Sequence, residues 1–281
     1  MKRKIQLIAL DLDGTLYNSQ SRISNYNKKI LKKAAASGIT VIISTGRPYI
    51  GLPLADMEEI GIHYAITANG AAVYRLPGKE LLFEDCLDTK TSAALLEELF
   101  QLELHLDAFI NGDGYSQTST SDLISRLHIP ESLREYIKTT RRRVPDLAAF
   151  IQENQYSIAK MTLNFAPASD GTFPSRDAAE AILKRHPEIS YVSGGFNNLE
   201  LTKKSISKAK GLALICKLLD IPPEAAMACG DSENDLDIVK AAGIGVAMGN
   251  AQQVLLDAAD FVSKSNDEDG VAYAVEKLCE L

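Results

Sequence analysis

The stretch Ile5-Gln-Leu-Ile-Ala-Leu-Asp-Leu-Asp-Gly-Thr-Leu16 determines which fold the chain can adopt. Its first six residues, up to Leu10, are almost continuously apolar, which is typical of a strand buried on both faces of a parallel sheet. The run ends in Asp11 and Asp13, and because side chains alternate along a strand, we expect both carboxylates to project to one side. Two carboxylates this close repel each other, so we expect a cation between them, for which Mg²⁺ is the natural candidate.

The aspartate pair has two other interpretations. A bare Asp-x-Asp pair is often only a solvated turn. A calcium loop of the EF-hand type would need glycine and glutamate at the sixth and twelfth positions from Asp11, where this chain has Leu16 and Arg22. The hydrophobic strand before the pair and Gly14-Thr15 after it favour a functional site over a simple turn.

Composition sets broad limits on function. A chain of 281 residues can bury a sizeable core in one large or two ordinary domains. The net charge of -7 argues against a general nucleic-acid or anionic-membrane binder, which would need a basic face. The first apolar run lasts only six residues, which is too short for a secretory or membrane segment. The four cysteines are far apart and predict reduced thiols in a cytoplasmic protein; they are Cys86, Cys216, Cys229 and Cys279.

The first part of the chain alternates strands and helices. Ser24 is a plausible N-cap for a helix over 25–37, and the β-branched run 39–44 predicts a second strand, parallel to the first and joined by a right-handed crossover. We further expect a helix over 49–60, a strand over 64–68, and strands over 71–75 and 81–84, the first of them after the turn dipeptide Asn69-Gly70. This order predicts a doubly wound, mainly parallel α/β sheet.

The pattern changes near residue 85 and indicates an inserted α+β domain. We expect helices over 91–103, 122–143 and 175–186, and strands over 105–110, 115–119, 157–165 and 189–193. The strand 198–202 is expected to return to the main domain. The predicted boundaries are therefore 84–195 for the inserted domain, and 1–83 with 196–281 for the core. Lys160 lies on the polar face of an alternating strand, which either faces a substrate or is simply solvated.

Three further strand ends carry polar groups. Thr45 and Gly46 follow the second strand beside a predicted helix start, where a hydroxyl and backbone amides can bind phosphate, although a capping threonine is the simpler alternative. Asp231 follows a strand over 225–229 and could complete a metal site, and Asn234 could donate its amide to a phosphate. Asp235, in the first turn of the next helix, also suits the positive end of the helix dipole.

Lys208 begins a helix, where a positive charge opposes the helix dipole. A bound anion at the same place would remove this conflict, although a surface lysine is the ordinary alternative. We also expect a strand over 243–247, a short strand over 261–263 and a closing helix over 271–280.

These stretches resemble the four motifs of the haloacid dehalogenase-like phosphohydrolases, and they occur in the same order. The motifs are Asp11-Leu-Asp-Gly-Thr-Leu16, Ser44-Thr-Gly-Arg47 in the form common in Cof-type members, Lys208 at a helix start, and Gly230-Asp-Ser-Glu-Asn-Asp235. The long interval between Thr45 and Lys208 is where the Cof-type group carries a large cap domain, which selects the substrate.

The resemblance implies a Mg²⁺-dependent phosphatase of small phosphorylated metabolites, such as sugar phosphates or phosphorylated cofactors, acting through an aspartyl-phosphate. It assigns Asp11 as the nucleophile and Asp13 as the general acid and base. The implied metal ligands are Asp11, the main-chain carbonyl of Asp13, and Asp231, with Asp235 either a direct ligand or a support. The implied phosphate-binding residues are Leu12, Thr45, Gly46, Lys208 and Asn234.

Two alternatives stay open at this stage: a phosphomutase of phosphosugars and a non-catalytic sensor of phosphorylated metabolites. The intact pair of Asp11 and Asp13 speaks against the sensor, because pure binding requires no nucleophile. The expected partner is a small phosphorylated molecule, with no nucleic acid and no membrane. The sequence identifies neither the metabolite, the cap residues that contact it, nor the oligomeric state.

Overall fold

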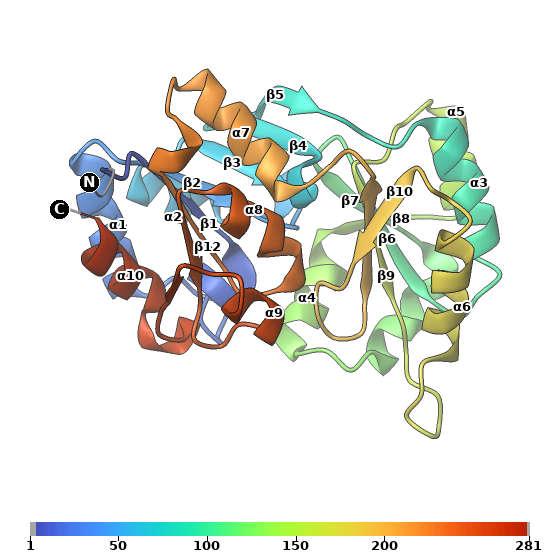
Figure 1. Cartoon of the computed structure of the whole chain (residues 1–281). Coiled ribbons are helices and arrows are strands. Elements are labelled where there is room, and N and C mark those ends of the chain that lie inside the picture. Colours follow the sequence, from blue (N-terminus) through green and yellow to red (C-terminus); the bar gives the residue numbers. More distant parts are fainter. Residues whose placement is uncertain (1–3, 280–281) are drawn as a thin grey trace. The chain divides into compact units, whose positions relative to one another are not determined.

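The structure is a computed structural model that describes residues 4–279, so the last residue of the helix expected over 271–280 lies outside the described part. The chain divides into two compact units (Figure 1). The core unit contains the chain up to Arg47, the segment Leu52–Phe83 and the chain from Ser207 onward. The inserted unit contains Pro48–Gly51 and Glu84–Ile206.

The core unit is built on an eight-stranded sheet in the order β14-β13-β12-β1-β2-β3-β4-β5. The pairs from β14 to β3 are parallel, and β3 and β4 form the antiparallel hairpin expected at Asn69-Gly70. The strands are β1 (Leu7–Leu10), β2 (Thr40–Ser44), β3 (Tyr64–Thr67), β4 (Ala72–Arg75), β5 (Glu80–Glu84), β12 (Ala226–Gly230), β13 (Ile244–Ala247) and β14 (Phe261–Val262).

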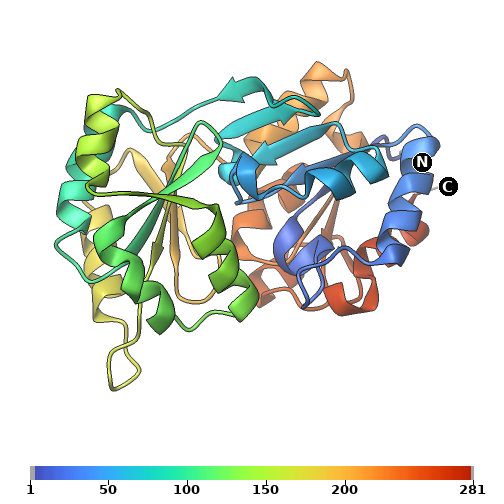
Figure 2. The ribbon, with the colours of Figure 1, turned by 180° about the vertical axis from the view of Figure 1, so that it is seen from behind.

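Helices cover both faces of this sheet, which explains why its central strands are fully buried. On one face α1 packs against α2 and α10, and on the other α7 packs against α8 (Figures 1 and 2). As expected, Ser24 caps α1 by accepting a hydrogen bond from the main-chain nitrogen of Asn27. The helices are α1 (Asn25–Ala36), α2 (Leu54–Ile60), α7 (Lys208–Leu218), α8 (Leu236–Ala241), α9 (Gln253–Leu256) and α10 (Gly270–Leu278). The predicted fold class is confirmed.

One predicted helix of the core is shorter than expected. Instead of a helix over 49–60, the chain forms a single short turn at Tyr49–Gly51, and α2 begins only at Leu54. The cause is Pro53, which disfavours helical geometry at Leu52 and has no N–H to donate.

The inserted unit has its own six-stranded sheet in the order β10-β11-β9-β6-β7-β8. All neighbouring pairs are antiparallel except β7 and β8. Apolar residues of the helices α3, α5 and α6 join those of one sheet face in a single core. The strands are β6 (His105–Ile110), β7 (Asp113–Gln117), β8 (Arg141–Val144), β9 (Lys160–Asn164), β10 (Ile189–Val192) and β11 (Leu199–Lys203). The helices are α3 (Thr89–Leu99), α4 (Glu131–Thr140), α5 (Leu147–Glu153) and α6 (Pro174–Leu183).

Two expectations for this unit were wrong. The strand expected to return to the core sheet is β11, and it pairs with β9 and β10 instead, because Leu199 and Leu201 belong to the apolar core of the inserted unit. The single helix expected over 122–143 is not continuous: Thr118–Arg126 form 3-10 turns, α4 spans only Glu131–Thr140, and the following residues form the edge strand β8 beside β7.

The polar face of β9 also differs from a simple solvated surface. Lys160 is 1% exposed and its Nζ lies 2.7 Å from Glu200 Oε1 on β11. Because a buried lysine needs a carboxylate partner, this ion pair explains how Lys160 is accommodated.

Among the residues that the structure describes, no helix is long and apolar enough to cross a membrane.

Candidate active site

The candidate site lies at the carboxyl ends of three neighbouring strands of the core sheet. Strands β12, β1 and β2 are adjacent and parallel, so their following loops emerge at the same edge. These loops carry the three predicted motifs around Asp11, Thr45 and Asp231. Open α/β sheets bind their ligands at such an edge, so the topology brings the candidate residues to a suitable place.

Lys208 connects two of the acidic residues. It begins α7, its side chain is fully buried, and its Nζ donates to Asp11 Oδ1 at 2.7 Å and to Asp235 Oδ1 at 2.5 Å. Burial alone would lower the pKa of Lys208, but the two carboxylates outweigh burial and raise it. Lys208 is therefore a buried, charged ammonium group, and the alternative of an ordinary surface lysine does not hold.

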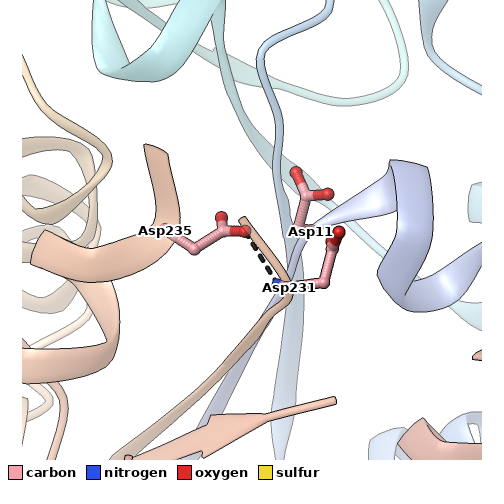
Figure 3. A group of neighbouring side chains, drawn as sticks. All are labelled: Asp11, Asp231 and Asp235. Carbon is pink, nitrogen blue, oxygen red and sulfur yellow. Dashed lines mark hydrogen bonds between the residues drawn. The ribbon is translucent and has the colours of Figure 1, made fainter. Parts of the chain in front are cut away.

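Asp235 supports the site from behind. Its Oδ2 accepts a hydrogen bond from the main-chain nitrogen of Asp231 at 3.0 Å (Figure 3). It accepts a second from the main-chain nitrogen of Ser232 at 3.2 Å. Its Oδ1 is held by Lys208. Since both oxygens have protein partners, the geometry favours Asp235 as a support that orients Lys208 and the loop of Asp231.

Asp231 reaches the loop that follows β1. Its Oδ1 accepts a hydrogen bond from Thr15 Oγ1 at 2.8 Å. Gly14 has φ +80°, and a Cβ built on it would lie 2.4 Å from Asp231 Oδ2. Only glycine fits here, because a side chain would both strain the backbone and push the carboxylate away.

The positive charge near Asp11 and Asp231 does not compensate for their burial and for the neighbouring carboxylates. Burial, and then Asp235, raise the pKa of Asp231 to about 7. Burial also raises the pKa of Asp11, with Lys208 opposing it and the neighbouring aspartates adding to it. A group of carboxylates that disfavours its own ionisation is a place where a bound cation would be stabilised.

The donor set fits Mg²⁺. Asp11, Asp231 and Asp235 each offer an oxygen, and these oxygens lie within 4.8 Å of one another. Mg²⁺ prefers oxygen ligands and is commonly held by one or two carboxylates. Since Asp235 is occupied by other partners, Asp11 and Asp231 are the two side chains suited to hold the ion.

Asp13 has a different environment from Asp11. Asp11 is 6% exposed, whereas the side chain of Asp13 is 54% exposed. Arg47 donates from Nε to Asp13 Oδ2 at 2.7 Å and from Nη2 to Asp13 Oδ1 at 2.6 Å. The Arg47 guanidinium also lies 5.0 Å from the centre of the Tyr17 ring. The two aspartates thus have separate cationic partners, Lys208 for one and Arg47 for the other.

The predicted phosphate-binding residues lie in the same group of loops. Thr45 is buried and its Oγ1 accepts a hydrogen bond from the main-chain nitrogen of Arg47 at 3.1 Å. Asn234 Nδ2 donates to Asn69 Oδ1 at 3.3 Å. Gly46 lies between Thr45 and Arg47 in this loop.

Direct hydrogen bonds unite only part of the predicted set. Leu12 is fully buried in the turn after β1. Lys208 joins Asp11 and Asp235, and the latter also joins Asp231. Among the described residues, no hydrogen bond links the side chains of Thr45 or Asn234 to Asp11.

Comparison of the sequence with models of known protein families identifies the family to which this group of residues belongs. Residues 8–275 match the sequence model of the haloacid dehalogenase-like hydrolases, which is nearly the whole chain. The chain belongs to the haloacid dehalogenase-like hydrolases. The resemblance inferred from the four motifs is therefore confirmed.

Two curated relatives from Bacillus subtilis (strain 168) are phosphatases. Phosphatase YwpJ is 32% identical over 287 residues, covering 98% of this chain and 100% of YwpJ. The 5-amino-6-(5-phospho-D-ribitylamino)uracil phosphatase YcsE is 29% identical over 276 residues, covering 96% of this chain and 94% of YcsE. The solved structure of a haloacid dehalogenase-like hydrolase from B. subtilis superposes with a TM-score of 0.84 at 29% identity, covering 97% of this chain and 99% of that chain. This hydrolase is an enzyme acting on phosphoric monoesters.

Sequence reasoning missed three contributors to this hydrolase site. Arg47 stood in the quoted motif, but its ion pair with Asp13 depends on how two loops meet. Thr15 also stood in a quoted motif, but its hydrogen bond to Asp231 depends on two strand ends lying side by side. Asn69 was expected mainly as a turn residue, and the structure places its side-chain oxygen against Asn234.

Proposed function

We propose that the protein is a Mg²⁺-dependent phosphatase that hydrolyses small phosphorylated metabolites through an aspartyl-phosphate on Asp11. The observation that carries this proposal is the arrangement around Asp11. One carboxylate oxygen is held by the buried Lys208, and Asp231 lies alongside. Among the described residues, no hydrogen bond reaches the other oxygen, which suits a nucleophile that is fixed in place but still able to attack.

In the first step, this free oxygen of Asp11 attacks the phosphorus of a phosphate monoester. A bond forms between the oxygen and phosphorus while the bond from phosphorus to the leaving alcohol oxygen breaks. Asp13 supplies the proton that the leaving alcohol requires. Because Asp13 is half exposed and follows Asp11 by two residues, its carboxyl group can reach a leaving group that points away from the core.

In the second step, water attacks the phosphorus of the aspartyl-phosphate. Asp13 accepts the proton of this water, the bond from Asp11 to phosphorus breaks, and inorganic phosphate leaves. The protons balance, since Asp13 loses one in the first step and regains one in the second. Asp11 ends as the carboxylate with which it began.

The charge that develops on the phosphoryl oxygens needs donors that are fixed beforehand. Lys208 is the buried cation nearest to Asp11 and is held by two carboxylates, so it cannot move away during the reaction. Thr45, the Gly46 amide and Asn234 lie in neighbouring loops and complete this set of donors, together with the main-chain amide of Leu12. A bound Mg²⁺, held by Asp11, the Asp13 carbonyl and Asp231, would neutralise charge on the transferring group.

The inserted unit is proposed to be the cap that selects the substrate. The sequence-based start of the cap at residue 84 is part of this proposal, and its end is placed at Ile206, where the inserted unit ends, in place of the expected 195. A cap excludes water during the first step and admits it for the second.

The substrate class and location are supported by relatives and by composition. YcsE is named as the phosphatase of a phosphorylated ribitylamino-uracil, which is a small phosphorylated metabolite. All four cysteines are free thiols, as we expect for a cytoplasmic protein. We expect no nucleic-acid or membrane partner.

A panel of phosphorylated metabolites tests the proposal. We expect release of free phosphate from at least one sugar phosphate or phosphorylated cofactor in the presence of Mg²⁺, and none in EDTA. A phosphomutase would release little phosphate and would need a bisphosphate activator. A sensor would bind a metabolite and release no phosphate, and either of these results would contradict the proposal.

A further inference from the structure

Two loops bring Asp11 and Asp231 together, and their relative position determines the candidate metal site. They are the loop of residues 11–15 after β1 and the loop of residues 230–235 after β12. A direct link joins them, because Thr15 Oγ1 donates to Asp231 Oδ1 at 2.8 Å. Gly14 packs so closely against Asp231 that even a Cβ on Gly14 would lie 2.4 Å from Asp231 Oδ2.

A third loop, Met248–Gln252, contacts both of these loops. It follows β13, the strand on the far side of β12 from β1. The main-chain nitrogen of Met248 donates to the Gly230 carbonyl at 3.0 Å, and that of Gln252 donates to the Asp231 carbonyl at 2.8 Å. Asn250 reaches past β12, and its Nδ2 donates to the Gly14 carbonyl at 2.8 Å. We call Met248–Gln252 the bracing loop.

The orientation of the Asn250 side chain is fixed by its partners. Its Oδ1 accepts a hydrogen bond from the main-chain nitrogen of Asn266 at 2.9 Å. An N–H can only donate and a carbonyl can only accept, so the Asn250 amide fits in one orientation only. The bracing loop is itself held by Gly249, whose main-chain nitrogen donates to the Lys264 carbonyl at 2.9 Å.

We propose that Asn250 is a positioning residue for the metal site, which it acts on through the carbonyl of Gly14. Among the described residues, no hydrogen bond joins the Asn250 side chain to the carboxylates of Asp11 or Asp231. Asn250 holds the turn that carries Asp11 and Asp13 at a fixed distance from Asp231, while Gln252 holds the loop of Asp231 from the same bracing loop. This inference rests on the proposed Mg²⁺-dependent function.

Magnesium binding by the full chain without substrate provides the test. We expect Asn250→Ala to weaken Mg²⁺ binding about ten-fold or more, the range typical for residues that orient metal ligands from outside. The measurement is a calorimetric titration with MgCl₂, supported by the rise in Tm that Mg²⁺ causes in each variant.

Asn250→Asp separates position from charge. The added carboxylate can still accept from Asn266, but it cannot donate to the Gly14 carbonyl. If positioning matters, Asn250→Asp weakens Mg²⁺ binding at least as much as Asn250→Ala does. If only charge mattered, the additional negative charge would strengthen binding, and that result would overturn the proposal.

Asn266→Ala is the matched control. Asn266 Nδ2 donates to the Tyr17 carbonyl at 2.9 Å, an equivalent bond to the same turn but farther from Asp11. We expect it to lower Tm without Mg²⁺ about as much as Asn250→Ala, while weakening Mg²⁺ binding by much less than the roughly ten-fold expected of Asn250→Ala. Equal weakening by both variants would show a general loosening of the turn and would refute a specific role for Asn250. If wild type itself bound no Mg²⁺, the proposed function would fail before this inference was reached.

Discussion

Lys208 is the residue on which the candidate site depends most. A buried ammonium group is tolerated only when carboxylates compensate it, and here Asp11 and Asp235 do so at 2.7 Å and 2.5 Å. The interdependence works in both directions, since Asp11 and Asp235 would be buried without compensation if Lys208 were absent. Replacing this lysine should therefore affect stability as well as activity.

We expect Lys208→Met to lower the free energy of unfolding by about 3–5 kcal/mol at neutral pH without added metal, the usual cost of breaking a buried ion pair. Adding Asp235→Asn should restore part of this loss, because it removes one of the two uncompensated carboxylates. Neither variant should hydrolyse phosphate esters. Urea unfolding followed by circular dichroism measures the stabilities, and a Lys208→Met protein as stable as wild type would contradict the role given to the ammonium group.

A second prediction at the scale of single residues concerns Gly14→Ala, with Gly38→Ala as its matched control. Both have positive φ, +80° and +87°, so alanine should cost about 1–2 kcal/mol of backbone strain at either position. An added Cβ on Gly14 would strike Asp231, whereas on Gly38 it would meet no described atom within 4 Å. We expect Gly14→Ala to lower Tm at least as much as Gly38→Ala, because the clash with Asp231 adds to the strain, and we expect a loss of phosphatase activity only for Gly14→Ala. If Gly14→Ala kept full activity, the contact with Asp231 would not matter.

At the scale of secondary-structure elements, strands β6 and β8 of the inserted unit share a buried charge cluster. Asp107 Oδ1 on β6 lies 3.2 Å from His105 Nε2 and 3.2 Å from Arg141 Nε on β8. The Arg141 guanidinium lies 4.9 Å from the ring centres of both Phe109 and Tyr136. Burial alone would raise the pKa of Asp107, but Arg141 and His105 together outweigh burial and lower the pKa.

This lowered pKa fixes the sign of a pH effect. A carboxyl whose folded pKa lies below its unfolded value, about 3.9, stabilises the fold above that value and loses this contribution as the pH falls through the folded pKa. Asp107→Asn should therefore destabilise the protein at pH 7, by leaving Arg141 without its carboxylate, and the difference from wild type should shrink below about pH 4. Urea unfolding at pH 7 and pH 3 measures both differences, and an unchanged difference would refute the ion pair.

Elements with local signals were predictable from the sequence, and elements that depend on distant partners were not. The helix α1 has its cap at Ser24 and the β3–β4 hairpin has its turn at Asn69-Gly70, and both formed as expected. The short apolar pattern of β11 fits either sheet equally well. Its place beside β9 is decided by packing partners that no local pattern reveals.

The candidate site shows the same division. The types and order of Asp11, Thr45, Lys208 and Asp231 could be read from the sequence because each follows or precedes a recognisable element. The ion pair of Arg47 with Asp13 could not, because it depends on the separation of two loops that belong to different strands. Burial of charges was equally hidden, since it depends on tertiary packing.

At the scale of the whole molecule, the chain combines two sheets that differ in strand direction and in which faces are buried. The core sheet is mainly parallel, its central strands are buried on both faces, and its acidic site residues follow the carboxyl ends of those strands. The inserted unit is mainly antiparallel, with an apolar core on one face and charged pairs among its other strand residues. Chemistry and substrate choice are thus proposed to reside in separate units, so variants of one should leave the fold of the other intact.

The central claim is that Asp11 is the nucleophile, and hydrolysis of p-nitrophenyl phosphate by Asp11→Asn with Mg²⁺ tests it most directly. Asparagine keeps an oxygen that accepts from Lys208, so the fold should persist and circular dichroism should match wild type. Asp56→Asn, which alters another lysine-paired carboxylate of the core unit, serves as the control and should retain activity. We predict that Asp11→Asn shows only background hydrolysis, because an amide cannot form the aspartyl-phosphate; hydrolysis at the wild-type rate would contradict the proposed mechanism.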